Sequence, residues 1–442
     1  MRPDFPFRPA AFPFFYGWVI VAAATLGIVA SIPGQTMGVS VFTDHLIEAT
    51  GLSRLQISNA YLLGTLMSGL LLPLGGSLVD RFGVRRTVVV ACSGLAATLT
   101  FLAFADRLAV DLATAVPFIP VAGASFALLA LGFTGIRFSG QGMLTLVSRT
   151  MMARWFERRR GLVSAISGPF VNFSFAGAPL LLALWIGRAG WRGAWLEMAI
   201  TVGVGMSAMG WLLFRESPEE CGLAMDGDEQ AAQEDSAATT QQSGNPGFTR
   251  AEALRTGAFW LVTSGIGIQA MVGTGITFHI VDLGSEMGLN AAQSVAIFLP
   301  IALVATPVGF FAGMAADRFP IRHLIMTMMV GQVLMFAGIA NMGDPWLRFV
   351  AIAGWGLASG FYGPLTVAAL PSFFGRTHLG SIQGAMMSCL VISSALGPSA
   401  LALLHGSFGS YVPGLYLMIA LPIGVLLVAP FTRDPVHPTE AR

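Results

Sequence analysis

The feature that most constrains this chain is a charged turn that occurs twice between long apolar runs. The first copy, at 76–86, reads GSLVDRFGVRR, with YLLGTLMSGLLLPLG before it and TVVVACSGLAATLTFLAF after it. The second copy, at 313–322, reads GMAADRFPIR. Both keep Gly-x-x-x-Asp-Arg-Phe and an arginine four residues after the Asp-Arg pair. A connecting turn that recurs in this way indicates a chain built from two copies of one folding unit.

The composition shows which solvent these runs require. The chain is 55% hydrophobic and only 11% charged, whereas a soluble domain is about 25% charged. These values exclude a soluble, a nucleic-acid-binding and a filamentous protein. All 24 basic residues are arginines, so a buried cation must be a guanidinium, whose planar fork suits carboxylates. The three cysteines suggest neither a disulfide nor a metal site, and we expect no cofactor.

Apolar segments of about 20 residues, enough to span a bilayer, recur along the whole chain. They lie near 16–41, 56–79, 86–105, 124–151, 161–186, 193–214, 257–281, 291–314, 321–341, 346–372, 380–404 and 411–431. They predict an all-α membrane protein with twelve transmembrane helices in two pseudo-symmetric six-helix bundles, at 1–215 and 251–442. The polar stretch 216–250 predicts a cytoplasmic linker. The first half is longer near 105–123, where Pro117 and Pro120 predict an external elbow.

The arginines predict how these helices cross the membrane. With a cytoplasmic N-terminus, most arginines fall on the cytoplasmic side, as the positive-inside rule requires. The arginines on the opposite side are Arg54, Arg107, Arg188, Arg192 and Arg348. Only Arg137 is left within the membrane. We therefore expect both termini to be cytoplasmic.

The motif, its second copy and the six-plus-six layout resemble the major facilitator superfamily over essentially the whole chain. Finer features resemble the bacterial branch of monocarboxylate and oxalate:formate porters. They are YGW at 16–18, RWFERRRGL at 154–162, GWRGAW at 190–195, RESPEECGL at 215–223 and EALRTGAFW at 252–260. The resemblance implies two bundles that rock around a central cavity, lined mainly by helices 1, 4, 7 and 10. It also implies a multi-pass protein of the bacterial cytoplasmic (inner) membrane.

In this family the motif latches the bundles together on the cytoplasmic side. The resemblance assigns that gate to Gly76, Asp80, Arg81, Gly83, Arg85 and Arg86, with Asp317 and Arg318 in the second copy. A carboxylate such as Asp80 is favoured at a helix N-terminus, which is consistent with a latch. The alternative is a charged turn that serves orientation alone. Pro320 stands in the second copy where the first has Gly83, which weighs against a latch role for that copy.

Arg137, in ALLALGFTGIRFSGQGMLTLV, is the most informative single residue. It lies near the middle of the fourth segment, too deep to reach the interface, and an arginine facing lipid at that depth is costly. We expect it to face the bundle interior and to bind an anionic substrate by a bidentate pair with a carboxylate. Gln141 is four residues on, on the same face. The alternative is a structural arginine bonded to neighbouring groups.

Other polar residues in the apolar segments are weaker candidates. Gln35, Gln269, Trp355 and Tyr362 lie on helices 1, 7 and 10, where substrate contact and interhelical packing are both open. His279 and Asp282, three residues apart, could carry protons, although an interfacial pair is an alternative. Glu197 in the sixth segment is another candidate proton carrier. The segments near 291–314 and 380–404 hold no charge, which favours a monoanion or zwitterion as the substrate.

These observations predict a secondary active transporter of a small organic anion, a monocarboxylate by preference, using alternating access with proton coupling or exchange. Its partners would be the anionic substrate, protons and the lipid bilayer, with no nucleic acid, and the chain would be monomeric. A drug or metabolite exporter working as a proton antiporter is the alternative. A membrane sensor would need a larger signalling domain, and no catalytic or ATP-binding motif indicates an enzyme.

Overall fold

The structure is a computed structural model that describes residues 5–116, 118–227, 247–290, 293–294, 296–375, 377–432 and 435. Within these residues every regular element is a helix and no strand occurs. Most of the predicted linker, 228–246, lies outside the described residues. Its first part forms two short 3-10 turns, η5 (Glu219–Cys221) and η6 (Met225–Gly227). Before the seventh span, Thr249 caps the four-residue helix α12 (Arg250–Ala253).

The apolar segments form long helices, because a backbone in lipid must satisfy its own hydrogen bonds. Among the described residues, 11 helices are long and apolar enough to cross a membrane. Seven correspond directly to predicted segments: α4 (Arg54–Phe82), α5 (Val84–Ala103), α13 (Gly257–Glu286), α15 (Phe298–Ala316), α16 (Ile321–Ile339), α17 (Pro345–Phe374) and α18 (Leu379–Phe408).

The predicted fifth and sixth helices account for the difference between 11 and twelve. Both lie in α9 (Arg160–Ile200), which continues through the π-helical η4 (Thr201–Met206) into α10 (Ser207–Leu213). Gly190 interrupts α9 with φ 70° and ψ 167°, so two helices meet there. The Gly190 break separates the segments predicted near 161–186 and 193–214.

Two spans differ from the continuous helices that the sequence predicts. The first is broken into α1 (Gly17–Val29), η2 (Ile32–Gly34) and α2 (Thr36–Ser40), so one helix over 16–41 is wrong. Pro33, which cannot donate a backbone hydrogen bond, lies at the break. The fourth runs from α7 (Val121–Ile136) through the π-helical η3 (Arg137–Leu144) into α8 (Thr145–Trp155).

The remaining helices are short. Before the first span lies η1 (Pro9–Ala11), and after α2 comes α3 (Thr43–Thr50). The last span consists of α19 (Tyr411–Met418) and α20 (Ala420–Val428), followed by η7 (Ala429–Phe431). The region of the predicted elbow contains α6 (Ala105–Ala115), whose Asp106 pairs with Arg192.

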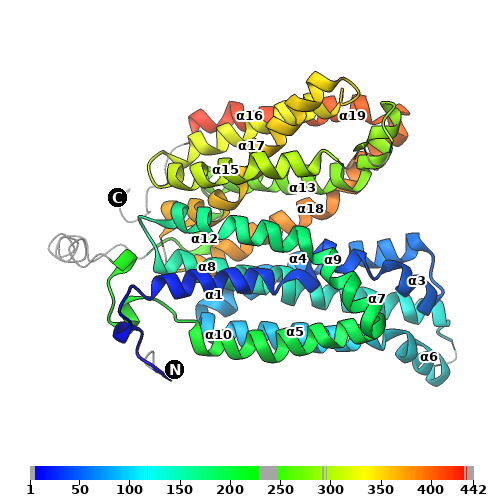
Figure 1. Ribbon diagram of the computed structural model, residues 1–442, viewed down its shortest axis with the longest axis horizontal. Helices are drawn as coiled ribbons and strands as arrows, with labels where there is room; N and C mark the ends of the chain where they lie inside the picture. Colours follow the sequence, from blue (N-terminus) through cyan, green and yellow to red (C-terminus); the bar gives the residue numbers. More distant parts are fainter. Residues whose placement is uncertain are drawn as a thin grey trace. The chain divides into compact units, whose positions relative to one another are not determined.

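The chain forms two compact units. Unit 1 comprises residues 1–155, 170–229 and 383–388, and unit 2 comprises 156–169, 230–382 and 389–442. Unit 1 therefore includes residues 383–388 of α18, although the rest of α18 belongs to unit 2. Unit 2 includes residues 156–169, which contain the start of α9, although most of α9 belongs to unit 1. In unit 2, α17 packs against both α15 and α16, and these helices run alongside one another (Figure 1).

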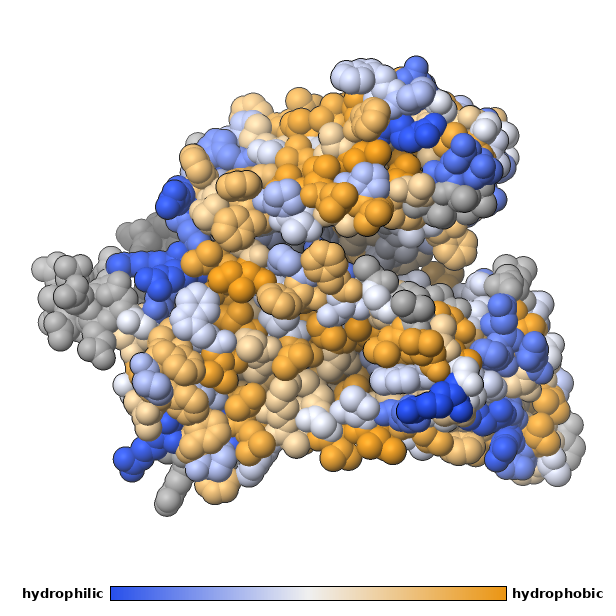
Figure 2. Space-filling view, viewed as in Figure 1, coloured by the Kyte–Doolittle hydropathy of each residue, from blue (hydrophilic) through white to orange (hydrophobic). Residues whose placement is uncertain are grey.

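The exterior of each unit is apolar over the length of its helices. Leu74 and Leu131 in unit 1 are both 62% exposed, and Leu299 and Leu403 in unit 2 are 70% and 72% exposed. Figure 2 shows apolar side chains along the helices and hydrophilic ones gathered toward helix ends. Soluble proteins seldom expose apolar surface on this scale. The lipid bilayer is the environment in which such a surface is stable.

Candidate functional site

Arg137 begins η3, the π-helical segment in the middle of the fourth span. Short π-helical turns inside α-helices are rare and often occur at functional sites. The side chain of Arg137 is buried, with the residue only 2% exposed. The structure therefore places this guanidinium inside unit 1 and away from lipid, as its cost in hydrocarbon requires.

The break in the first span lies directly against η3. A Cβ atom on Gly140 would lie 2.9 Å from the Cα atom of Gly34, and a side chain at Gly34 would collide with the Ile136 carbonyl. Only glycine permits this approach of two backbones. Across the contact, Arg137 Nη1 donates a hydrogen bond of 3.1 Å to the Gly34 carbonyl oxygen. The broken helix thus supplies a partner for the buried guanidinium.

Tyr61 of α4 covers one face of the Arg137 guanidinium. The Arg137 Cζ atom lies 5.3 Å from the centroid of the Tyr61 ring, within the range of a cation–π interaction. The Tyr61 hydroxyl donates to Thr36 Oγ1 of α2 at 3.0 Å. Tyr61 is not among the residues predicted for the site, since its separation from Arg137 along the chain gives no sign of contact.

Part of the hydrogen-bonding capacity of this junction is unused. Arg137 Nε and Gln141 Oε1 are buried and make no hydrogen bond within the described chain. Arg137 also forms no ion pair with any described carboxylate. Gln35 lies at the same break, where its Nε2 donates to Ser31 Oγ at 3.0 Å. An arginine without a carboxylate partner, next to an amide, can bind the carboxylate of a small molecule.

The predicted residues of helices 7 and 10 lie in unit 2, and their environments differ. Gln269 is buried, accepts from Gln332 Nε2 at 3.1 Å and donates to Ser359 Oγ at 3.3 Å. Trp355 is 5% exposed and packs edge-on against Phe298 at 5.6 Å, within the apolar core. This environment matches the packing alternative for Trp355.

The remaining candidate on helix 10 and the three proton-carrier candidates have distinct surroundings. Tyr362 is half-buried on α17. His279 bonds to the Pro398 carbonyl and the Tyr411 hydroxyl, each at 3.0 Å. Asp282 is exposed and does not form an ion pair with His279. Glu197 pairs with the exposed Arg188 at 2.6 Å, which matches a solvated position.

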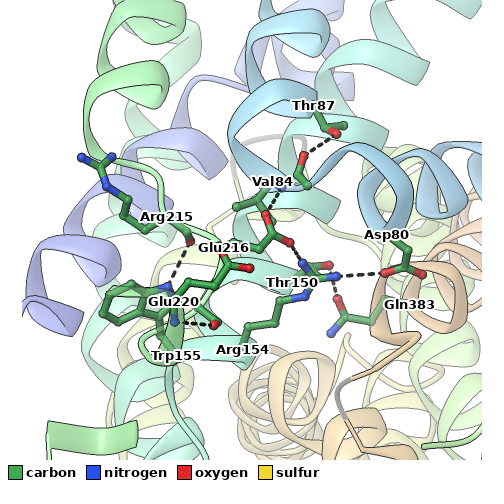
Figure 3. Close-up of polar contacts among 12 residues, drawn as sticks. Asp80, Val84, Thr87, Thr150, Arg154, Trp155, Arg215, Glu216, Glu220 and Gln383 are labelled. Carbon is green, nitrogen blue, oxygen red and sulfur yellow. Dashed lines mark hydrogen bonds and ion pairs between the residues drawn. The ribbon is translucent and has the colours of Figure 1, made fainter. Parts of the chain in front are cut away.

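The first motif copy ends in a cluster of ion pairs, shown in Figure 3. Arg154 Nη2 lies 2.9 Å from Asp80 Oδ1, and Arg154 Nη1 pairs with Glu216. Glu216 Oε2 also accepts from the Val84 backbone N–H at 2.7 Å. Gly83 has φ +80°, in the region that favours glycine, and this turn brings Val84 to the carboxylate. Neither Arg154 nor Glu216 is among the residues predicted for the site, although the stretches 154–162 and 215–223 carry part of the family resemblance.

The other motif residues of the first copy serve different contacts. Arg85 is buried and donates to the carbonyl oxygens of Trp211 and Phe5, at 2.5 and 2.7 Å. Arg81 and Arg86 are exposed. Gly76 lies against α18, since a Cβ on Gly384 would be 3.0 Å from the Gly76 Cα atom.

The aspartate of the second motif copy binds the start of a helix. Asp317 Oδ1 accepts from the Gly161 N–H at 2.8 Å, and Oδ2 accepts from the Leu162 N–H at 3.1 Å. Both donors belong to the first turn of α9, where a carboxylate is favoured. Arg318 is exposed. Pro320 therefore does not prevent the second aspartate from capping a helix.

Comparison with known proteins places these features in a family. The family model of the Major Facilitator Superfamily matches residues 19–398. Human "Monocarboxylate transporter 11" is 25% identical, over 96% of this chain and 87% of that protein. Among solved structures, the human organic anion transporter MFSD10 has a TM-score of 0.65 at 14% identity, over 94% of this chain and 99% of that one.

The E. coli fucose:proton symporter has a TM-score of 0.63 at 11% identity, over 95% of this chain and 100% of that one. An anion transporter and a sugar symporter thus share this fold, so the fold alone does not define a substrate. The family model, in contrast, spans most of the chain. The chain therefore belongs to the major facilitator superfamily and is a multi-pass membrane transporter of small organic substrates, not an enzyme.

Proposed function

We propose that this transporter carries a small organic anion, a monocarboxylate by preference, by alternating access. The observation that carries the proposal is the buried guanidinium of Arg137, which has no carboxylate partner among the described residues. Its Nε donor and the nearby Gln141 Oε1 are both unused. A carboxylate bound here would supply the missing negative charge and accept a hydrogen bond from Arg137 Nε.

The chemistry around Arg137 favours one negative charge on the substrate. Tyr61 occupies one face of the guanidinium and the Gly34 carbonyl occupies one of its donors. Only part of the hydrogen-bonding capacity of the Arg137 guanidinium is therefore left for a ligand. Among the described residues, no second cation contacts Arg137. A relative named as a monocarboxylate transporter agrees with this substrate class.

The remaining predicted features complete the proposal. Gln35 and Gln269 are proposed substrate-side residues in their respective units, with Tyr362 as a further candidate. The motif at 76–86, and Asp317 with the start of α9, are the proposed cytoplasmic latches, while the Asp80–Arg154 ion pair lies within the first bundle. We propose a monomer in the bacterial inner membrane, with bundles 1–215 and 251–442 joined by the linker 216–250 and both termini cytoplasmic.

Coupling to protons or exchange remains part of this proposal. Glu197, whose substitution would test the exporter alternative, is paired with Arg188.

The proposal is tested by uptake into proteoliposomes that contain the purified full chain. Radiolabelled acetate, lactate and pyruvate are compared with lactamide, which lacks the carboxylate. We expect uptake of at least one acid and none of the amide. Arg137→Ala should reduce kcat/KM for that acid about 10- to 100-fold, because a charge-assisted hydrogen bond contributes about 1.5–3 kcal/mol.

Matched variants separate substrate binding from folding. Arg137→Lys keeps the charge but loses the fork, and should recover only part of the uptake. Arg107→Ala, which removes an exposed arginine, should leave uptake unchanged. All variants are checked for equal reconstitution and thermal unfolding. Uptake of no acid by the wild type, or equal uptake by Arg137→Ala, would contradict the anion assignment.

A further inference from the structure

We propose that Glu286, His405, Tyr411 and His279 form a proton-binding junction that ties α13 to α18 and α19. These residues lie in unit 2. The junction does not include the predicted His279–Asp282 pair. The junction deepens the proposed function, since it names a site for the proton that coupling requires. Its structural part can nevertheless be tested without any substrate.

Glu286, at the end of α13, joins three helix ends. Its Oε1 lies 3.0 Å from His405 Nε2 in the last turn of α18. Its Oε2 accepts from Ser410 Oγ at 2.9 Å and from the Tyr411 N–H at 3.0 Å, at the start of α19. One carboxylate therefore holds the last turn of α18 and the first turn of α19 against α13.

Tyr411 lies between two imidazoles. The His405 ring is 4.3 Å from the Tyr411 ring, centroid to centroid, with 35° between their planes. On the other side, the Tyr411 hydroxyl is 3.0 Å from His279 Nδ1. A single side chain thus connects the histidine of α18 to the histidine of α13.

The partners of His279 define the tautomer of its neutral ring. Nε2 faces the Pro398 carbonyl oxygen at 3.0 Å, and a carbonyl can only accept, so Nε2 carries the hydrogen. In the neutral ring Nδ1 is then an acceptor, and the Tyr411 hydroxyl donates to it. Neutral His279 is therefore fully hydrogen-bonded. A second proton would turn Nδ1 into a donor and force the Tyr411 hydrogen to point elsewhere.

His405 responds to a proton in the opposite direction. Protonated His405 forms an ion pair with Glu286, whereas the neutral ring offers at most a hydrogen bond. The His405 side chain is 40% exposed and that of Glu286 is 24% exposed, so a proton can reach the pair. Protonation therefore strengthens the junction at His405.

Other charged groups near the junction have different contacts. The carboxylate of Asp282 on α13 interacts electrostatically with Tyr411, as Glu286 does. In the turn before α17, Asp344 caps the helix, and the Met342 carbonyl accepts from Arg348 of the first turn of α17. Gly343 of that turn lies next to the end of α13. Glu286 is therefore the carboxylate that meets a histidine here.

Histidine changes charge between about pH 5 and pH 8, so a double-mutant cycle at two pH values tests the junction. Thermal unfolding of the purified full chain is measured for the wild type, His405→Gln, Glu286→Gln and the double variant. Near pH 5.5 we expect each single change to lower the unfolding temperature by roughly 1–2 °C, with little further loss in the double variant. Near pH 8 the coupling between the two positions should be markedly smaller, because a neutral His405 ring can only donate a hydrogen bond to Glu286.

His323→Gln provides the matched control, because His323 is an exposed histidine on another helix. The effect of His323→Gln on the unfolding temperature should be the same at both pH values. A cycle that is additive at both pH values, or a coupling that is as large near pH 8 as near pH 5.5, would overturn the proposal. So would a loss in His323→Gln equal to that in His405→Gln.

A transport measurement then connects the junction to coupling. The pH profile of uptake is recorded in proteoliposomes for the acid that the wild type takes up, with His405→Gln and His279→Gln beside it. We expect both variants to flatten the rise of uptake at acid pH, and His323→Gln to keep it. Coupling in the unfolding cycle together with unchanged pH profiles would overturn the role in coupling. Absence of all uptake would fail the proposed function while the unfolding cycle still tests the proton-binding site.

Discussion

The two copies of the Gly-x-x-x-Asp-Arg-Phe motif share a sequence, and their aspartates bind different groups. Asp80 in unit 1 pairs with the Arg154 guanidinium, which also binds Glu216. Asp317 in unit 2 instead accepts two backbone N–H groups at the start of α9. One aspartate is half-buried among charged side chains, and the other is exposed at a helix end.

The difference arises from what surrounds each turn. Gly83 adopts a positive φ, which lets the Val84 N–H and Arg154 share Glu216. In the second copy, Gly161 passes so close to the Gly313 carbonyl that a side chain at Gly161 would collide with it. This approach brings the N–H groups of α9 within reach of Asp317. The repeated motif therefore places an aspartate carboxylate in each turn, and the packing around the turn decides which donor binds that carboxylate.

Among substitutions at the two turns, removal of the Arg154 guanidinium should lower the unfolding free energy most. Arg154→Gln removes the guanidinium that Asp80 and Glu216 share, and we expect a loss of about 3 kcal/mol in unfolding free energy. Thermal and denaturant unfolding in detergent would measure it. Adding Glu216→Gln should recover part of the loss, since it removes one carboxylate. A loss no larger than that of the exposed Arg81→Gln would contradict the assigned ion-pair cluster.

The turn itself can be tested next. Gly83→Ala places a Cβ in a left-handed conformation and beside the Glu216 carboxylate, and should cost about 1–2 kcal/mol. Pro320→Ala is the matched change in the second copy, where φ is −56°, and should cost less than about 1 kcal/mol. Equal losses in the same unfolding assay would show that the two turns do not differ in this respect.

The smallest effect is expected at the helix cap. Asp317→Ala removes both acceptors of the α9 N–H groups and should cost about 1 kcal/mol. Asp317→Asn keeps one acceptor oxygen and should cost only a few tenths of a kcal/mol. Hydrogen exchange of the first turn of α9 would locate the change. An unchanged exchange rate in Asp317→Ala would argue against the cap.

Much of the fold could be predicted from local sequence. The lengths of the apolar runs predicted the spans, and Gly190 lies between the two predicted segments that α9 joins. Pro33 and Gly34 marked the break in the first span, but the apolar run around them continues, so one helix was predicted. The elbow near 105–123 was predicted from unequal spacing, whereas its short helix α6 was not.

The candidate site could be predicted only in part. Arg137 stood out because it is a charge inside a span, and the structure buries it as expected. Its partners Tyr61 and Gly34 lie far away in sequence, and nothing in their own segments indicates a guanidinium nearby. Likewise, three-residue spacing suggested Asp282 as the partner of His279, while the ring bonds to Tyr411 and Pro398.

The sequence by itself predicted a membrane transporter with twelve apolar segments, a duplicated turn and one arginine in the middle of a span. It could do so because the bilayer acts on each segment separately: every span must be apolar and must satisfy its own backbone. Only the tertiary structure decided which group each charge meets: Arg154 for Asp80, the start of α9 for Asp317, and Tyr61 with Gly34 for Arg137. Those choices depend on where glycines let distant backbones touch, and that is a property of packing between helices.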